Sequence, residues 1–266
     1  MSLDFTLEKY RELCEAATKL QYTVLTVGTY LVSQNLPQKY IILRHDVDRN
    51  PNRALQMARL EHEFNINTSY YFRFNKRTFQ PNLVREIANM GHEIGYHYET
   101  LDKANGDYER AVQIFEFELE EIRKVIAVKT ICMHGNPLTR WNNIDLWNKY
   151  DFKDLGIIGD AFLSFHEITY FSDTGRTWNN RFKIKDRFPH NISSDGRDKE
   201  NATVKSTDDL IHLIKRESLQ SIYIGVHPER WSGNLFGWMK SLAFDIGVNL
   251  GKQLIMLMNP RILSGG

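Results

Sequence analysis

The sequence predicts an α/β fold built on a parallel sheet, either open or closed into a barrel. Short apolar runs alternate with amphipathic stretches of helical spacing, an order typical of parallel strands joined by right-handed crossovers. The chain has 266 residues, 42% of them hydrophobic, which is enough to bury a large core in one domain. Polar and metal-binding side chains follow several of the apolar runs, as at the carboxyl ends of strands in such folds.

The opening part of the chain contains the clearest strand and helix start. Apolar residues at three- to four-residue spacing predict a helix over 7–20, whereas 24–32 is ambiguous between strand and helix. Residues 40–43 read as a buried strand. The next helix is expected to begin with Asn50 as N-cap and Pro51 at its first position.

Strands and helices then alternate. We expect strands over 68–74, 92–96, 130–133 and 157–158. Between them we expect helices over 81–90, 107–128 and 142–150. The polar stretch 173–205 lacks periodicity, which is typical of functional or irregular segments. A helix over 207–219, capped by Thr207 or Asp208, and a strand over 222–226 complete the pattern.

Composition and charge narrow the classes of function. The net charge of +1 gives no electrostatic reason to expect nucleic acid as a partner. Cys14 and Cys132 are the two cysteines and lack the paired spacing of zinc ribbons or redox motifs, so we expect no disulfide framework. Residues 1–30 lack the basic start, apolar core and cleavage site of a secretion signal. A cytoplasmic location is therefore expected.

The late apolar segment 236–258 is expected to form a packed helix rather than a membrane span. Lys240, Asp245 and Lys252 interrupt it, and such charges are costly in the middle of a bilayer. An interfacial helix is the second interpretation, so peripheral membrane association stays open.

Expected strand ends carry side chains that bind metals or exchange protons: Asp46 and Asp48, His97, His134, and His227. The two aspartates are two residues apart, so both point to one side of an extended strand. The carboxyl ends of parallel strands lie on one face, which brings the later histidines to the same place. One Asp with two His is a common zinc set with an open position for water, and it also suits ferrous iron.

The segments Arg44-His-Asp-Val-Asp48, Gly91-His-Glu-Ile-Gly-Tyr-His97 and Ile222-Tyr-Ile-Gly-Val-His227 resemble the polysaccharide deacetylase family, carbohydrate esterase family 4. The resemblance spans roughly residues 40–230. It implies a distorted (β/α) barrel of mostly parallel strands and a divalent metal, most often Zn²⁺. It further implies removal of acetyl groups from N-acetylated sugars.

The resemblance also implies residue roles and a domain plan. Asp46 would be the general base and His227 the general acid, with Asp48 and His97 as metal ligands. We expect a barrel over 39–230, with an N-terminal helical extension over 1–38 and a C-terminal helical segment packed on the barrel over 231–266.

Several positions depart from the family's motifs. Val47 separates two aspartates that are commonly adjacent in the family, and Leu101 occupies the place of a second histidine. We expect His134, which ends the next strand, to be the third ligand, with Glu99 as the alternative. Arg176 is the candidate to replace the arginine of the third motif.

The function predicted is that of a metal-dependent deacetylase acting on an N-acetylated amino sugar, nucleotide- or lipid-linked, in cell-surface polysaccharide biosynthesis. Trp178 and Trp231 lie beside Arg176 and His227 in the sequence, and one of them is expected to line the cleft because aromatic faces pack on sugar rings. One alternative is a carbohydrate-binding or scaffolding protein, left with a degenerate site by Leu101. Another is a metal-dependent hydrolase of a non-sugar amide.

Overall fold

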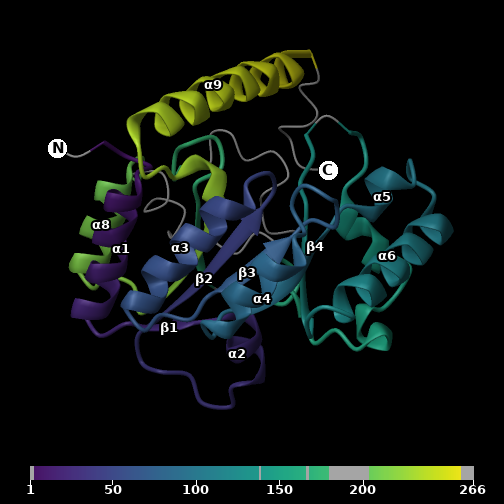
Figure 1. The fold of residues 1–266 in the computed structure, drawn as a ribbon, viewed down its shortest axis with the longest axis horizontal. Coiled ribbons are helices and arrows are strands. Elements are labelled where there is room, and N and C mark those ends of the chain that lie inside the picture. Colours follow the sequence, from purple (N-terminus) through teal and green to yellow (C-terminus); the bar gives the residue numbers. More distant parts are fainter. Residues whose placement is uncertain (1–2, 138, 166–167, 180–203, 259–266) are drawn as a thin grey trace.

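A parallel sheet forms the centre of the molecule (Figure 1). The computed structural model describes residues 3–137, 139–165, 168–179 and 204–258. Within them the sheet has eight strands in the order β6-β5-β4-β3-β2-β8-β7, and β1 pairs with the first half of β2. The strands are β1 (Thr23–Leu25), β2 (Tyr40–Val47), β3 (Ser69–Phe72), β4 (Glu93–Tyr98), β5 (Thr130–Met133), β6 (Gly159–Asp160), β7 (Thr169–Ser172) and β8 (Ser221–Val226).

The sheet curls into a barrel that is open between β6 and β7. Both Arg44 of β2 and Tyr223 of β8 donate a hydrogen bond to the carbonyl of Ala161, which directly follows β6, at 3.2 and 3.0 Å. The two ends of the strand order are therefore joined across the barrel interior. The predicted distorted (β/α) barrel of parallel strands is confirmed.

Helices cover the outside of the barrel, and sequence signals start several of them. Asn50 caps α3 by accepting from the Arg53 amide, and Pro51 takes the first position. Ser206 and Asp209 form a capping box at α8. The α-helices are α1 (Leu7–Lys19), α2 (Val27–Val32), α3 (Pro51–Glu63), α4 (Pro81–Asn89), α5 (Thr100–Lys103), α6 (Tyr108–Arg123), α8 (Thr207–Lys215) and α9 (Leu235–Met258); the 3₁₀ turns are η1 (Asn143–Asn148), η2 (Phe152–Leu155) and η4 (Pro228–Arg230).

The alternation of side chains along β2 separates two environments. Arg44 and Asp46 point into the barrel, whereas His45 and Val47 point outward against the helices. His45 Nε2 lies 2.7 Å from Glu61 Oε1 of α3, in a fully buried network beneath α1. A strand buried on both faces explains why residues 40–43 read as a continuous apolar run.

Glu61 is the centre of this buried network. Its carboxylate accepts hydrogen bonds from Tyr10, from Tyr70 at 2.8 Å and from Thr68 at 2.9 Å. Burial alone would raise the pKa of Glu61, but the charge and hydrogen bond of His45, together with the other donors, outweigh it and lower this pKa to about 2. The network therefore holds an ionised carboxylate in the layer that joins α1 and α3 to the sheet.

Several elements differ from expectation. The ambiguous segment 24–32 contains both β1 and α2, so the N-terminal extension, expected to be helical, also adds a strand to the sheet. The strand expected over 157–158 begins two residues later as β6, and β7 was not expected. The cap of α8 is Ser206 rather than Thr207 or Asp208. Most of the polar stretch 173–205 lies outside the described residues.

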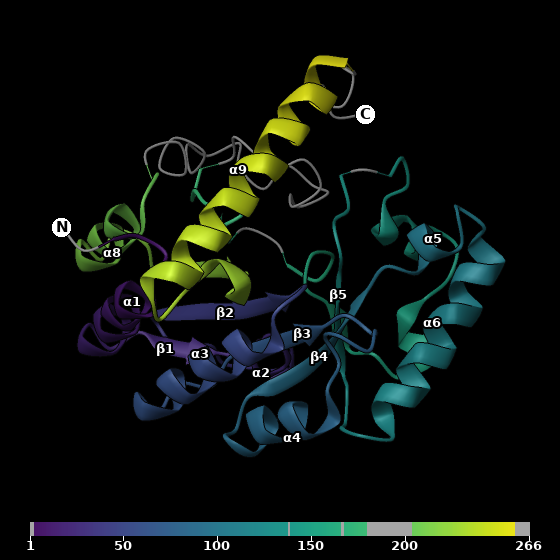
Figure 2. The same cartoon turned by 45° about the horizontal axis from the view of Figure 1, so that its top comes forward.

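The C-terminal helix α9 forms a separate layer along one side of the barrel (Figure 2). Among the residues described, none of the helices combines the length and the hydropathy required for a membrane span. The domain boundaries at 38 and 230 stay a prediction.

Candidate active site

A cavity of about 740 Å³ lies at the carboxyl ends of the central strands, with α9 as one of its walls. The structure brings together there the residues predicted to do the chemistry: Asp46, Asp48, His97, His134 and His227. They come from β2, β4, β5 and β8 or from the residues directly after them. The rule that parallel strands end on one face therefore places them correctly.

Asp48, His97 and His134 form a compact cluster on one side of the cavity. Asp48 Oδ1 lies 3.2 Å from His97 Nε2 and 3.7 Å from His134 Nε2. The two imidazole rings are nearly perpendicular, with centroids 5.3 Å apart. This Asp48 oxygen is buried, and both imidazole nitrogens face it. One carboxylate oxygen and two imidazole nitrogens are a donor set that divalent cations accept, although among the residues described only Asp46, His97 and Cys132 have ligand atoms that all lie within 4.8 Å of one another.

The other ring nitrogens of this cluster face groups that would orient the ligands. His97 Nδ1 lies 2.9 Å from the carbonyl oxygen of Cys132, and His134 Nδ1 lies 3.3 Å from Glu99 Oε2. Metal-binding histidines usually have such a carbonyl or carboxylate behind them. Glu99, the alternative third ligand, is thus placed behind His134 and not among the residues that line the cavity.

Electrostatics keep the carboxylates of this cluster ionised. Burial would raise the pKa of Asp48, but the neighbouring His134 and His97 hold it well below its usual range. For Glu99, burial is likewise outweighed by His134 and by Arg73, whose Nη2 lies 2.5 Å from Oε2, and its pKa is lowered to about 2. Both groups are therefore available to a cation or to an imidazolium near neutral pH.

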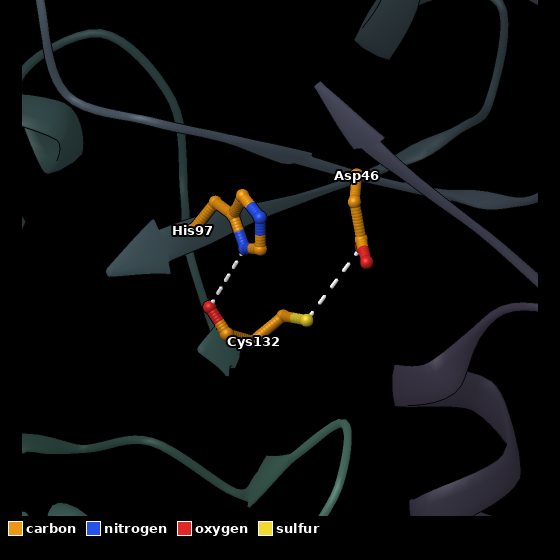
Figure 3. A group of neighbouring side chains, drawn as sticks. All are labelled: Asp46, His97 and Cys132. Atoms are coloured by element: carbon orange, nitrogen blue, oxygen red, sulfur yellow. Dashed lines mark hydrogen bonds between the residues drawn. The ribbon is translucent and has the colours of Figure 1, made fainter. Parts of the chain in front are cut away.

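A second set of candidate ligands shares His97. One ligand atom each from Asp46, His97 and Cys132 lie within 4.8 Å of one another, and all three residues are buried (Figure 3). The Cys132 thiol lies 3.6 Å from Asp46 Oδ1. Sequence reasoning missed Cys132 as a neighbour of the site, although it immediately precedes Met133-His134 on a predicted strand.

Asp46 has a buried arginine partner. Arg44 Nη2 lies 3.3 Å from Asp46 Oδ2, and both side chains are buried. Hydrogen bonds to Tyr170 and Tyr223 hold the guanidinium in place. Arg176, the candidate to replace the arginine of the third motif, binds Asp245 and Ser241 of α9 and is not among the residues that line the cavity. The alternation along β2 could have identified Arg44, because it lies two residues before Asp46.

His227 is held by a carboxylate that sequence reasoning did not select. Its Nδ1 lies 2.6 Å from Asp173 Oδ1, and its backbone amide also donates to Asp173. Burial and Arg230 lower the pKa of His227, but Asp173 outweighs them and raises it above the usual value. With Nδ1 engaged, Nε2 is the ring nitrogen available to a ligand in the cavity.

The predicted tryptophans do not line the cavity. Trp178 and Trp231 are both 0% exposed, in the apolar core beneath α1 and α8. Their indole nitrogens donate to Thr207 and Asp173, respectively. The expectation that one of them offers its face to a sugar therefore needs correction, because burial leaves neither face accessible. Trp231 instead helps to position the carboxylate behind His227.

Leu101 occupies the position at which the resemblance implies a second histidine. It lies in the short helix α5, 1% exposed, and packs in the main apolar core. A histidine there would bury a polar ring among apolar side chains. His134, from β5, reaches the place near Asp48 and His97 instead.

Comparisons with known proteins were made by sequence and by structure. No protein-family model matches the chain, and no curated protein sequence matches it. A solved protein of Mycobacterium smegmatis, assigned as a polysaccharide deacetylase, is similar over 81% of this chain and 85% of its own, with 16% identity and a TM-score of 0.43.

Two further solved structures are mutants of a carbohydrate esterase family 4 pseudoenzyme. The first, described as having restored enzymatic activity, has 9% identity and a TM-score of 0.37, over 82% of this chain and 65% of its own. The second has 10% identity and a TM-score of 0.36, over 83% and 68%. At these values the likenesses assign no residue role and no activity to this chain. The similar solved structures nevertheless bear the family name that the sequence motifs predict.

Proposed function

We propose that this protein is a metal-dependent amide hydrolase that removes the acetyl group of an N-acetylated amino sugar during cell-surface polysaccharide biosynthesis. The observation that carries the proposal is the buried Asp48 oxygen directed at the Nε2 atoms of His97 and His134. A site with two histidines and one carboxylate leaves an open position for water, as hydrolytic zinc sites do.

Asp48, His97 and His134 would hold the metal. When bound, a divalent ion of the zinc type supplies a water of lowered pKa and polarises the amide carbonyl. The Asp46 carboxylate, fixed by Arg44, takes the proton of the attacking water. His227, whose pKa is raised by the neighbouring Asp173, acts in its protonated form and donates its proton to the departing amine nitrogen. Base and acid thus come from different strands of the same cavity wall.

The set of Asp46, His97 and Cys132 is the competing assignment of the metal. It would occupy the carboxylate that the hydrolytic reaction needs as a base. The set with Asp48 leaves Asp46 available, so it agrees better with hydrolysis. We therefore favour Asp48 over Cys132 as a ligand beside His97.

Metal content separates an enzyme from a binding protein with a degenerate site. Protein purified without chelator is expected to contain a near-stoichiometric divalent metal, which His97→Ala loses. The matched control is His62→Ala, because His62 is exposed on α3. A folded protein that takes up no metal under any loading condition would contradict the enzyme proposal.

Acetate release identifies the substrate class. We expect zinc-dependent acetate release from one member of a panel of N-acetylated sugar nucleotides, lipid-linked sugars and short oligosaccharides. Activity confined to non-sugar amides would instead support the alternative of a non-sugar amide hydrolase. A cytoplasmic location is part of this proposal, and both buried cysteines, Cys14 and Cys132, lie outside any disulfide in the described part of the chain.

A further inference from the structure

Helix α9 turns polar side chains toward the barrel and apolar side chains toward solvent, which is the reverse of an ordinary surface helix. Its inward face is polar: Trp238 donates to the Asp4 carbonyl, Ser241 to the Glu229 carbonyl and Asn249 to the Gly175 carbonyl, at 2.7 to 2.9 Å. Asp245 lies on the same face, 4% exposed, and pairs with Arg176 at 3.1 Å. Polar groups thus attach α9 to the body.

The outward face of α9 is apolar. Its large side chains are 50% to 80% exposed, and they are Leu235, Phe236, Met239, Ile246 and Leu250. At 3.6 residues per turn these positions fall within an arc of about 100°, opposite the polar contacts. A continuous exposed stripe of this kind marks an interaction surface, whereas scattered exposed apolar residues do not.

The charges beside the stripe are basic. Of the three charged residues of α9, Asp245 and Lys252 are buried and Lys240 is exposed. The guanidinium of Arg49 lies 3.9 Å from the ring centroid of Phe244 on the flank of the helix, but it is paired with Glu229, so the basic charge that the proposal uses is that of Lys240. On the described part of α9 no carboxylate is exposed. A second copy of α9 would therefore offer no acid to Lys240, whereas anionic lipid headgroups would.

We propose that the outward stripe of α9 docks this protein on the surface of an anionic membrane. The helix lies in the interface, with its apolar side chains at the boundary between headgroups and acyl chains and Lys240 at the level of the phosphates. The polar face remains bound to Arg176 and its neighbours, so the helix docks while attached to the barrel.

The same helix contributes a wall of the cavity. Phe244 and Val248 line it, on the side of α9 between the outward stripe and the polar contacts. An amino sugar carried on a membrane lipid fits this arrangement, because the docked surface and the cavity share one helix. This last step rests on the proposed function, whereas the docking itself does not.

Cosedimentation of the full chain with vesicles tests the docking. We expect binding to vesicles of phosphatidylcholine with phosphatidylglycerol and weaker binding to phosphatidylcholine alone. The triple variant Phe236→Ser, Met239→Ser, Ile246→Ser is expected to lower the partition coefficient at least tenfold, because it removes three large apolar side chains that docking would take out of water. Lys240→Glu is expected to weaken binding to the anionic vesicles selectively, and it keeps the test valid if the triple variant fails to fold.

The matched control is Phe117→Ser, which removes another exposed phenylalanine, 59% exposed on α6, and is expected to leave vesicle binding unchanged. Docking is refuted if the wild type binds neither kind of vesicle, or if Phe117→Ser loses as much binding as the triple variant. A third result would also refute docking: the wild type forms a dimer, the triple variant does not, and neither binds vesicles. The stripe would then be a contact between two copies of this chain. Vesicle binding without acetate release from any substrate would leave docking supported and contradict the proposed function alone.

Discussion

Asp46 and Asp48 acquire different chemistry although two residues separate them. Asp46 lies inside the barrel end, where Arg44 fixes one oxygen and the Cys132 thiol faces the other. Asp48 lies beyond the strand, between two imidazoles that keep it ionised. An arginine partner fixes the position of the carboxylate proposed to accept a proton, and paired imidazoles suit one that binds a cation.

The first prediction at the residue scale concerns Asp46. Asp46→Asn removes the proposed base, so we expect kcat for acetate release to fall about 100- to 10,000-fold while metal content is retained. Kinetics and metal analysis on the same preparation check this. The control is Asp154→Asn, because Asp154 is exposed on η2. Undiminished activity in Asp46→Asn would remove Asp46 as the base.

The second concerns Asp173. Its negative charge raises the pKa of His227, and the proposed acid must be protonated to act. Activity is therefore expected to decline as pH rises through the pKa of His227, and Asp173→Asn should move this alkaline limb to lower pH. The pH profile of kcat/KM measures the shift. An alkaline limb in the same place in both proteins would contradict the role of His227 as acid.

Sequence reasoning found the strand-end residues but not their partners. Asp46, Asp48, His97 and His134 follow from the rule that parallel strands end on one face. Asp173 was not selected because it follows β7, a strand whose place beside β8 is set by long-range pairing. Arg176, Trp178 and Trp231 were misplaced because nearness in sequence does not determine which face of a buried layer a side chain occupies.

At the scale of elements, α9 depends on one buried carboxylate. Asp245 lies 3.1 Å from Arg176, 3.8 Å from Arg230 and 4.0 Å from Arg49. Asp245→Asn removes the carboxylate that pairs with Arg176, whereas Arg230 keeps Asp173 and Arg49 keeps Glu229, so we expect a loss in the free energy of unfolding on the order of 3 kcal/mol. Faster amide hydrogen exchange in α9 than in the strands would show that the helix detaches first.

Asp208→Asn is the control for Asp245→Asn. Asp208 pairs with the buried Lys9 at 2.6 Å but is itself 40% exposed, and Lys9 keeps a second ion pair with Glu12 when Asp208 is changed. We expect a change within about 1 kcal/mol. Equal losses in the two variants would show that α9 is not held by its polar face.

Helix and strand ends were predictable where a local signal fixes them. Asn50-Pro51 begins α3 where the sequence predicts. By contrast, β6 has two residues, and its place depends on pairing with Thr130 and Ile131 of β5. Such short edge strands have no periodicity of their own, so sequence alone could not locate them.

For the whole molecule, Glu61 predicts how stability depends on pH. Its pKa is about 2 in the folded state against an ordinary value of 4.5. The resulting stabilisation, on the order of 3 kcal/mol, is present above the ordinary value and is lost as pH falls from there through about 2.

Urea unfolding between pH 5 and pH 3 should show a decline in the free energy of unfolding that Glu61→Gln reduces. The matched control is Glu63→Gln, because Glu63 is 58% exposed on the same helix. The same decline in Glu61→Gln as in the wild type would contradict this account.

We propose that residues at the carboxyl ends of β2, β4 and β5 together hold one divalent metal. Anomalous diffraction at the zinc edge, from crystals of the zinc-loaded protein, tests it most directly. We predict one peak in the cavity, about 2.0–2.2 Å from an Asp48 oxygen and from the Nε2 atoms of His97 and His134. No peak in the cavity, or a peak bound by Asp46 and Cys132 with Asp48 and His134 outside its coordination, would contradict it.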